Sequence, residues 1–136
     1  MKTDEQIDAL AAQVSFMAEM SGTQHVFVPV NLNNIHWAGV LIDVTKKTIA
    51  MYDSLARQNP AARVGSIASA IQVKLTSFST VSLNSPLQND DANCGLFVVM
   101  KFWRAVDSTV SKVMTDTALK RRRFEVLHFI LTGKAM

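Results

Sequence analysis

The only cysteine of the chain lies in the stretch Pro86-Leu87-Gln88-Asn89-Asp90-Asp91-Ala92-Asn93-Cys94-Gly95-Leu96-Phe97, where a polar loop leads into an apolar helix. A thiol at a helix N-terminus lies at the positive end of the helix dipole, beside backbone N–H groups that have no helical partner, and both favour the thiolate. The same N–H groups can stabilise an oxyanion, and Gln88 offers a further side-chain donor six residues upstream. The stretch therefore predicts that Cys94 is a nucleophile for acyl transfer.

Composition sets the class of protein. The 136 residues fit a single domain, residues 1–136, and the 49% hydrophobic content is typical of a globular protein. Lys+Arg 14 against Asp+Glu 11 leaves a net charge of only +3, so we expect no nucleic-acid partner. One cysteine excludes an intrachain disulfide and a multi-cysteine zinc site, and no apolar run reaches the length of a membrane span. These features predict a protein of a reducing compartment, the cytoplasm or nucleus, that does not bind membranes.

Apolar spacing and turn residues predict four helices and four strands. The expected helices are Asp4–Met20, Pro60–Leu75, Gly95–Val106 and Thr115–Leu131, and the expected strands are Val26–Leu32, Trp37–Val44, Thr48–Tyr52 and Phe78–Leu83. We divide the chain into an N-terminal helical part, residues 1–22, and a core, residues 26–131.

Individual segments carry more detailed expectations. Trp37–Val44 is almost entirely apolar, which predicts a central strand covered on both faces, while Pro29 indicates an edge strand or a bulge. Gly95–Val106 is apolar on nearly every side, which predicts a helix buried in the centre of the domain. In the last helix we expect an inward apolar face and an outward, solvated basic run, Lys120–Arg123. The expected inward residues are Leu119, Phe124, Leu127, Ile130 and Leu131.

A nucleophilic cysteine needs a base, and His36 at the start of a predicted strand is the best-placed candidate. Asp53 directly follows another predicted strand and could accept the second ring N–H of His36, which would fix the tautomer. His25 in a polar linker and His128 in the last helix are weaker candidates, and His128 fits a structural role better.

Each of these residues also has a structural interpretation. His36 could be a strand residue packed beside Trp37, and Asp53 could be an ordinary turn aspartate. Gln88 could be a solvated loop residue, and Cys94 a small buried hydrophobic residue. Trp37 could line a substrate channel or belong to the core.

Three groups of residues resemble one known family. They are Val28-Pro29-Val30-Asn31 before His36-Trp37; Met51-Tyr52-Asp53-Ser54-Leu55; and Gln88 with Asn93-Cys94-Gly95-Leu96-Phe97. In this order and spacing they resemble the ubiquitin-like-protein-specific cysteine proteases, which deconjugate SUMO and NEDD8 and are related to the adenovirus-type proteases. Arg121-Arg122-Arg123-Phe124-Glu125-Val126-Leu127 is similar to the terminal helix of that family.

The resemblance implies an α+β fold of the papain-like, adenovirus-protease type. In such a fold a small mixed sheet packs against a central buried helix that starts at the catalytic cysteine. It implies that Cys94 is the nucleophile, His36 the general base, Asp53 its orienting partner and Gln88 an oxyanion-hole donor, with Trp37 lining the substrate channel. The implied reaction cleaves after the Gly-Gly tail of a ubiquitin-like protein or its conjugates, through a thioester and without a metal or cofactor.

The chain departs from the family pattern in three ways, one of which is a short interval between Asp53 and Cys94. Members of the family usually carry a longer segment before the histidine-bearing strands, and Asn93 stands where the family often has aspartate. Two alternatives therefore stay open: a truncated binding module of the same fold, and an effector-type acetyltransferase that uses the same Cys-His pair. An effector would be secreted and delivered into a host cell.

Overall fold

The computed structural model describes residues 4–32, 36–53, 58–83 and 93–133. These ranges form four helices and four strands, whose bounds lie close to those predicted. The elements are α1 (Asp4–Ala18), β1 (His25–Leu32), β2 (His36–Asp43), β3 (Thr48–Tyr52), α2 (Gln58–Lys74), β4 (Ser79–Leu83), α3 (Cys94–Val106) and α4 (Asp116–Thr132). The predicted α+β fold class is confirmed.

The four strands form one mixed sheet in the order β1-β2-β3-β4. β1, β2 and β3 pair antiparallel, and β4 pairs parallel to β3, so the chain must cross over between these two strands, which it does through α2. Lys47, at φ 55, closes the short turn between β2 and β3. Pro29 lies on the edge strand β1, as its missing N–H requires.

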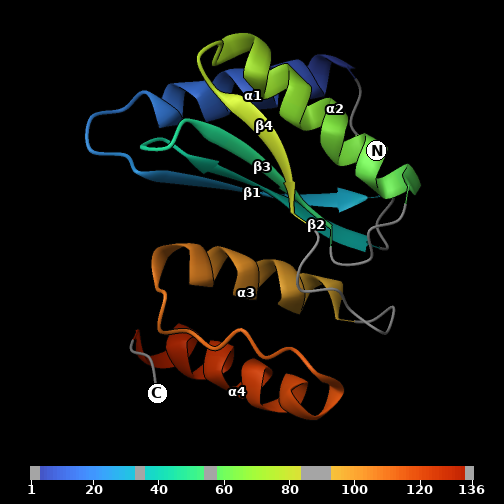
Figure 1. Cartoon of the computed structure of the whole chain (residues 1–136), viewed down its shortest axis with the longest axis vertical. Helices are drawn as coiled ribbons and strands as arrows, with labels where there is room; N and C mark the ends of the chain where they lie inside the picture. Colours follow the sequence, from blue (N-terminus) through green and yellow to red (C-terminus); the bar gives the residue numbers. More distant parts are fainter. Residues whose placement is uncertain (1–3, 33–35, 54–57, 84–92, 134–136) are drawn as a thin grey trace.

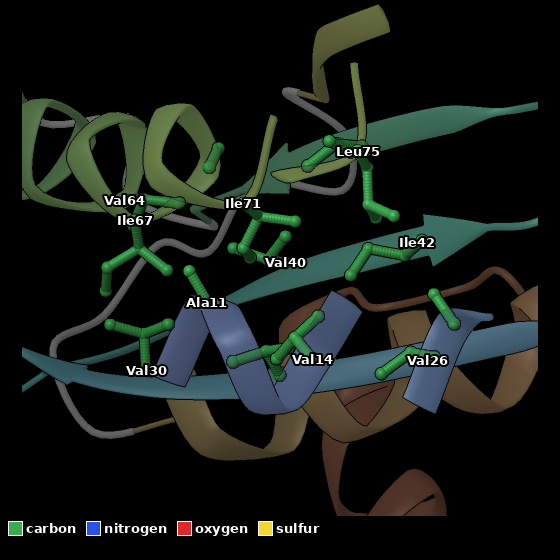
Figure 2. Packing of buried hydrophobic residues seen from close by; sticks show 14 of the residues in the cluster. Ala11, Val14, Val26, Val30, Val40, Ile42, Val64, Ile67, Ile71 and Leu75 are labelled. Carbon is green, nitrogen blue, oxygen red and sulfur yellow. The ribbon is translucent and has the colours of Figure 1, made fainter. Parts of the chain in front are cut away.

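Helices cover both faces of this sheet, as Figure 1 shows: α1 and α2 lie on one face, α3 lies on the other, and α4 lies beyond α3. On the α1/α2 side, aliphatic side chains from the two helices interlock with those of β1 and β2 (Figure 2). The labelled members are Ala11, Val14, Val26, Val30, Val40, Ile42, Val64, Ile67, Ile71 and Leu75. This apolar packing holds the sheet rigid.

A second apolar cluster joins α3 to the opposite face of the sheet. Phe97, Val98 and Met100 of α3 are buried there against Leu41 and Tyr52 of the sheet. In this layer Phe102 stacks on Phe27, with the ring centroids 4.7 Å apart and the ring planes 3° from parallel. The cluster fixes α3, and with it Cys94, relative to β2.

α3 is central, but it is not buried on nearly every side as its composition predicted. Val99 and Val106 are 44% and 57% exposed. The reason is that α4 covers only part of the side of α3 that faces away from the sheet (Figure 1). An apolar composition alone therefore overestimated how far this helix is enclosed.

The predicted orientation of α4 is wrong. Leu119 is buried as expected, but Phe124, Leu127, Ile130 and Leu131 are 52% to 73% exposed. The basic run is also divided, because Arg122 is 8% exposed and its Nε lies 2.6 Å from Glu125 Oε1, whereas Lys120, Arg121 and Arg123 are exposed. In the described ranges α4 packs chiefly against α3, so most of its apolar side chains have no layer to cover them.

Gly39 allows α3 to approach β2 closely. A Cβ at this position would lie 2.8 Å from Phe102 Cζ and 3.2 Å from Val98 Cγ1. We expect Gly39→Ala to lower the free energy of unfolding by about 1–3 kcal/mol, because Phe102 must move out of its stack on Phe27. Chemical denaturation measures this change.

Gly65 in α2 is the matched control for that substitution. Its nearest neighbour to an added Cβ is Met51 Sδ at 3.9 Å, so there is room for a methyl group. Because alanine is the better helix former, Gly65→Ala should raise stability by up to about 1 kcal/mol. Equal effects of the two substitutions would show that Gly39 is not a packing requirement.

Candidate active site

The sheet places His36 and Asp53 side by side. His36 begins β2 and Asp53 directly follows β3. Antiparallel pairing of Gly39 with Tyr52 puts these two strand ends at the same end of the sheet. His36 Nε2 lies 2.6 Å from Asp53 Oδ1, and both side chains are buried, at 6% and 7% exposure. A carboxylate in this position holds the imidazole in one orientation.

Cys94 approaches the same end of the sheet from helix α3. It is the first residue of α3, and its Sγ accepts a hydrogen bond from the backbone N–H of Trp37 at 3.3 Å. Trp37 follows His36 in the chain, so the thiol lies against the backbone that carries the imidazole. Since Asp53 engages Nε2, the ring nitrogen that remains for the thiol is Nδ1. The structure thus brings together three residues that are up to 58 positions apart in the sequence.

Trp37 covers the start of α3. Its side chain is 40% exposed, which excludes the core role considered from the sequence. A Cβ at Gly95 would lie 3.6 Å from Trp37 Cδ1, so the edge of the indole passes directly over the backbone next to Cys94. An aromatic wall beside the thiol is the geometry expected of a narrow substrate channel.

The other candidates have different outcomes. Gln88 lies outside the described residues, so its oxyanion role stays a prediction. His25 is the first residue of β1 and lies opposite Asp43, at the far end of the β1–β2 pair from His36. His128 is on α4, with its Nδ1 3.4 Å from Thr132 Oγ1. Neither histidine competes with His36 for Cys94.

One contact near the thiol was missed from the sequence. Arg123 Nη2 on α4 donates a hydrogen bond to Oδ1 of Asn93, the residue before Cys94. The two residues are 30 positions apart and belong to different elements, so no local pattern predicts the contact. In the described ranges no group of three His, Cys, Asp or Glu side chains could hold a metal, and no helix is long and apolar enough to cross a membrane.

Tyr52 completes the buried surroundings of Asp53. It is fully buried, and Lys101 Nζ lies 5.3 Å from the centre of its ring. Burial, and then the neighbouring Asp53 carboxylate, raise the pKa of Tyr52 above its usual 10.0. Burial, with Arg104 and Lys112, lowers the pKa of Lys101.

The raised pKa of Tyr52 predicts a loss of stability in alkali. Above about pH 10 the unfolded chain releases the phenol proton while the folded chain keeps it, so the free energy of unfolding falls as pH rises. Tyr52 is the only tyrosine, so tyrosinate absorbance should appear together with unfolding rather than before it. The lowered pKa of Lys101 makes the free energy of unfolding rise with pH instead. The Tyr52→Phe variant therefore shows how much of the pH dependence is due to tyrosine. Tyrosinate forming in a fully folded chain would contradict the prediction.

Comparison with known proteins identifies the family of the chain. Residues 11–128 match the Ulp1 protease family, C-terminal catalytic domain. Ubiquitin-like-specific protease 1 of Saccharomyces cerevisiae is 33% identical over 117 residues, which cover 79% of this chain and 18% of that protein. The chain therefore spans much less than the full length of this relative.

Solved structures agree with that match. The SUMO protease Ulp1 with its catalytic cysteine oxidised to a sulfonic acid gives a TM-score of 0.71 at 22% identity, over 96% of this chain and 63% of that one. The C-terminal Ulp1 protease domain in complex with Smt3, the yeast ortholog of SUMO, gives 0.65 at 26% identity, over 80% of this chain and 52% of that one. The Xanthomonas campestris effector XopD bound to ubiquitin gives a TM-score of 0.57 at 22% identity, over 89% of this chain and 74% of that one. Because the family match spans residues 11–128, and the start of α3 brings Cys94 to the end of the sheet that carries His36 and Asp53, the chain belongs to the Ulp1 protease family.

Proposed function

We propose that this chain is the catalytic part of a thiol protease that cleaves after the C-terminal Gly-Gly tail of a ubiquitin-like protein, either from a precursor or from a lysine conjugate. The observation that carries the proposal is the juxtaposition of Cys94 with the His36–Asp53 pair. The thiol contacts the Trp37 backbone at 3.3 Å, and the imidazole next to that backbone is fixed to Asp53 at 2.6 Å. A thiol, an imidazole and a carboxylate in this order are the parts of an activated nucleophile.

In the proposed reaction His36 Nδ1 takes the proton of Cys94, while Asp53 accepts the Nε2–H and supports the imidazolium. The Cys94 sulfur attacks the carbonyl carbon of the last glycine, and the C=O electrons move to the oxygen. The backbone N–H of Cys94, together with Gln88, would stabilise this oxyanion.

The tetrahedral species then breaks its C–N bond, and the imidazolium gives its proton to the leaving amine. A water molecule, deprotonated by His36, attacks the resulting thioester, which releases the Gly-Gly carboxylate and restores the thiol. His36 therefore acts twice as a base and twice as an acid, because the imidazolium formed from water returns its proton to the departing Cys94 sulfur, and no reactant other than water is needed.

The substrate class rests on Trp37 and Gly95 and on the named complexes of the relatives. The Trp37 indole lies beside the Gly95 backbone next to the nucleophile, and a channel walled by this indole would suit a tail of residues without side chains. One related domain is bound to Smt3 and another relative to ubiquitin. A ubiquitin-like protein is thus the partner that fits both the local geometry and the family.

The direct test uses ubiquitin-like proteins that carry an electrophile in place of the C-terminal carboxylate. SUMO, NEDD8 and ubiquitin probes are each incubated with the chain, and mass spectrometry detects a covalent adduct. We expect at least one adduct, which Cys94→Ala abolishes. If no probe reacts, or if the adduct persists in Cys94→Ala, the proposal is wrong. An adduct without cleavage of the matching conjugate would favour the binding module instead, and labelled acetyl transfer from acetyl-CoA to Cys94 would favour the acetyltransferase.

Trp37 offers a second test of the channel. We expect Trp37→Ala to lower kcat/KM for the reactive ubiquitin-like substrate by about tenfold, mainly through KM, because the tail loses its aromatic wall. The half-exposed indole adds little to the core, so the melting temperature should change little. The control is iodoacetamide, which needs no channel and should still alkylate Cys94. An unchanged KM would remove Trp37 from the substrate-binding site.

A further inference from the structure

Asn93 does not cap the helix that carries the nucleophile. Asparagine is among the residues preferred at an N-cap, where its side-chain oxygen accepts a backbone N–H of the first helical turn. Asn93 stands at the N-cap of α3 with φ −108 and ψ 16, and its side chain makes no capping hydrogen bond. Its Oδ1 accepts a hydrogen bond from Arg123 on α4 instead.

Because the Asn93 oxygen is bound to Arg123, it does not accept a backbone N–H of the first turn of α3. The first hydrogen bond of the helix runs from Phe97 N–H to Asn93 O, at 3.0 Å. The N–H groups of residues 94–96 come before it and therefore have no acceptor within the helix. Those are the N–H groups that favour the thiolate of Cys94 and could stabilise an oxyanion. A capping carbonyl oxygen would occupy the N–H of residue 95 or 96 and place the negative end of its dipole near the sulfur.

The position of Arg123 is held by its neighbours. Arg122, the adjacent residue, is buried, so its side of α4 faces the packed interior, and its Nε lies 2.6 Å from Oε1 of Glu125 on the same helix. Further along, Trp103 of α3 and Phe129 of α4 pack with ring centroids 5.1 Å apart. The guanidinium is therefore presented to the start of α3 by a packed pair of helices, which lie side by side in Figure 1.

We propose that Arg123 is a positioning residue that holds the Asn93 side chain away from the N-terminus of α3, which leaves the first-turn N–H groups available to the sulfur and to the reacting carbonyl oxygen. Its effect on turnover rests on the proposed function, but its effect on the reactivity of Cys94 does not. Among the described residues, the titratable groups beside Cys94 that come from the sheet are His36 on β2 and Asp53 after β3.

The test measures the rate of Cys94 alkylation by iodoacetamide as a function of pH, in the whole chain and without any substrate. In Arg123→Ala the Asn93 side chain is released, so that residue 93 can move from ψ 16 to the extended conformation of an N-cap and its oxygen can cap the helix. We expect alkylation near neutral pH to slow by about fivefold and its midpoint to move to higher pH. Arg123→Lys, which keeps a donor and the charge, should stay close to the unaltered chain.

A double-mutant cycle with Asn93→Ala separates this role from two others. Asn93→Ala removes the oxygen itself, so it should leave alkylation near the original rate, and adding Arg123→Ala to it should then have no effect. If Asn93→Ala slows alkylation as much as Arg123→Ala, the contact acts as a tether between the helices and the proposal is wrong. If Arg123→Ala still slows alkylation in the Asn93→Ala background, the arginine acts through its charge, which also overturns the proposal.

Two further variants serve as a control for the alkylation measurement and as a substitute for Arg123→Ala. Arg121→Ala removes a neighbouring exposed cation that forms no hydrogen bond to the described residues, and it should not change alkylation. Should Arg123→Ala fail to fold, Arg123→Met keeps most of the side-chain length without a donor and should show the same slowing. If the unaltered chain cleaves no ubiquitin-like substrate, the proposed function fails, while the alkylation cycle still decides the role of Arg123.

Discussion

Cys94→Ser should lower kcat/KM for cleavage of a ubiquitin-like substrate by on the order of 10⁴-fold or more, with little loss of stability. Serine keeps the size of the side chain but replaces a thiol, of which a fraction ionises near neutral pH, by a hydroxyl that does not. The residue is only 5% exposed and lies at a helix start, so the substitution changes one atom within a packed site.

The measurement compares steady-state cleavage with binding. If the variant is inactive because the nucleophile is lost, its Kd for the uncleaved conjugate should stay close to that of the unaltered chain, and its circular dichroism should be unchanged. Retention of more than about a hundredth of the activity would mean that Cys94 does not form the covalent intermediate.

Asp53→Asn is expected to lower kcat by about 10³- to 10⁴-fold. The carboxylate accepts a hydrogen bond from His36 Nε2 at 2.6 Å. An amide of the same shape can instead donate through its nitrogen, which would favour the opposite tautomer and place the ring proton on Nδ1, facing the thiol. The imidazole could then no longer take the proton of Cys94, and the imidazolium would lose its counter-charge in a buried site.

Asp43→Asn provides the matched control. Asp43 is also paired with a histidine, because its Oδ2 lies 3.7 Å from His25 Nε2, but this pair is at the opposite end of β1 and β2 and is partly exposed. The same chemical change there should leave kcat unaltered. Equal losses in the two variants would show that the effect comes from general destabilisation, and an active Asp53→Asn would remove Asp53 from the catalytic machinery.

The strands were predictable because their signals are local. Thr48–Tyr52 has the same bounds in the structure as in the sequence prediction, and β2 differs by one residue at each end. Pro29 indicated the edge strand, because a strand inside the sheet would need its missing N–H. The meeting of His36 with Asp53 follows from this hairpin, since antiparallel neighbours bring the start of one strand to the end of the next.

The helices on the far side of the sheet were predictable only in part. Helical periodicity shows that a helix has an apolar face, but it does not show whether another layer covers that face. For this reason Phe124 and Leu127 were expected inside and are half exposed, while Arg122 was expected outside and is buried. The Arg123–Asn93 contact depends on how two helices pack, which no residue spacing encodes.

The contacts of the site also determine when it can form during folding. The His36–Asp53 pair joins residues 17 apart, but the hydrogen bond from Trp37 to Cys94 joins residues 57 apart and requires α3 to be seated on a finished sheet. Contacts of such long sequence separation form late, because much of the chain entropy is lost before they are made. As the ribosome releases the chain from its N-terminus, the histidine and aspartate are in place before the sulfur arrives. The contacts of the Cys94 thiol are therefore complete only once the tertiary structure has formed.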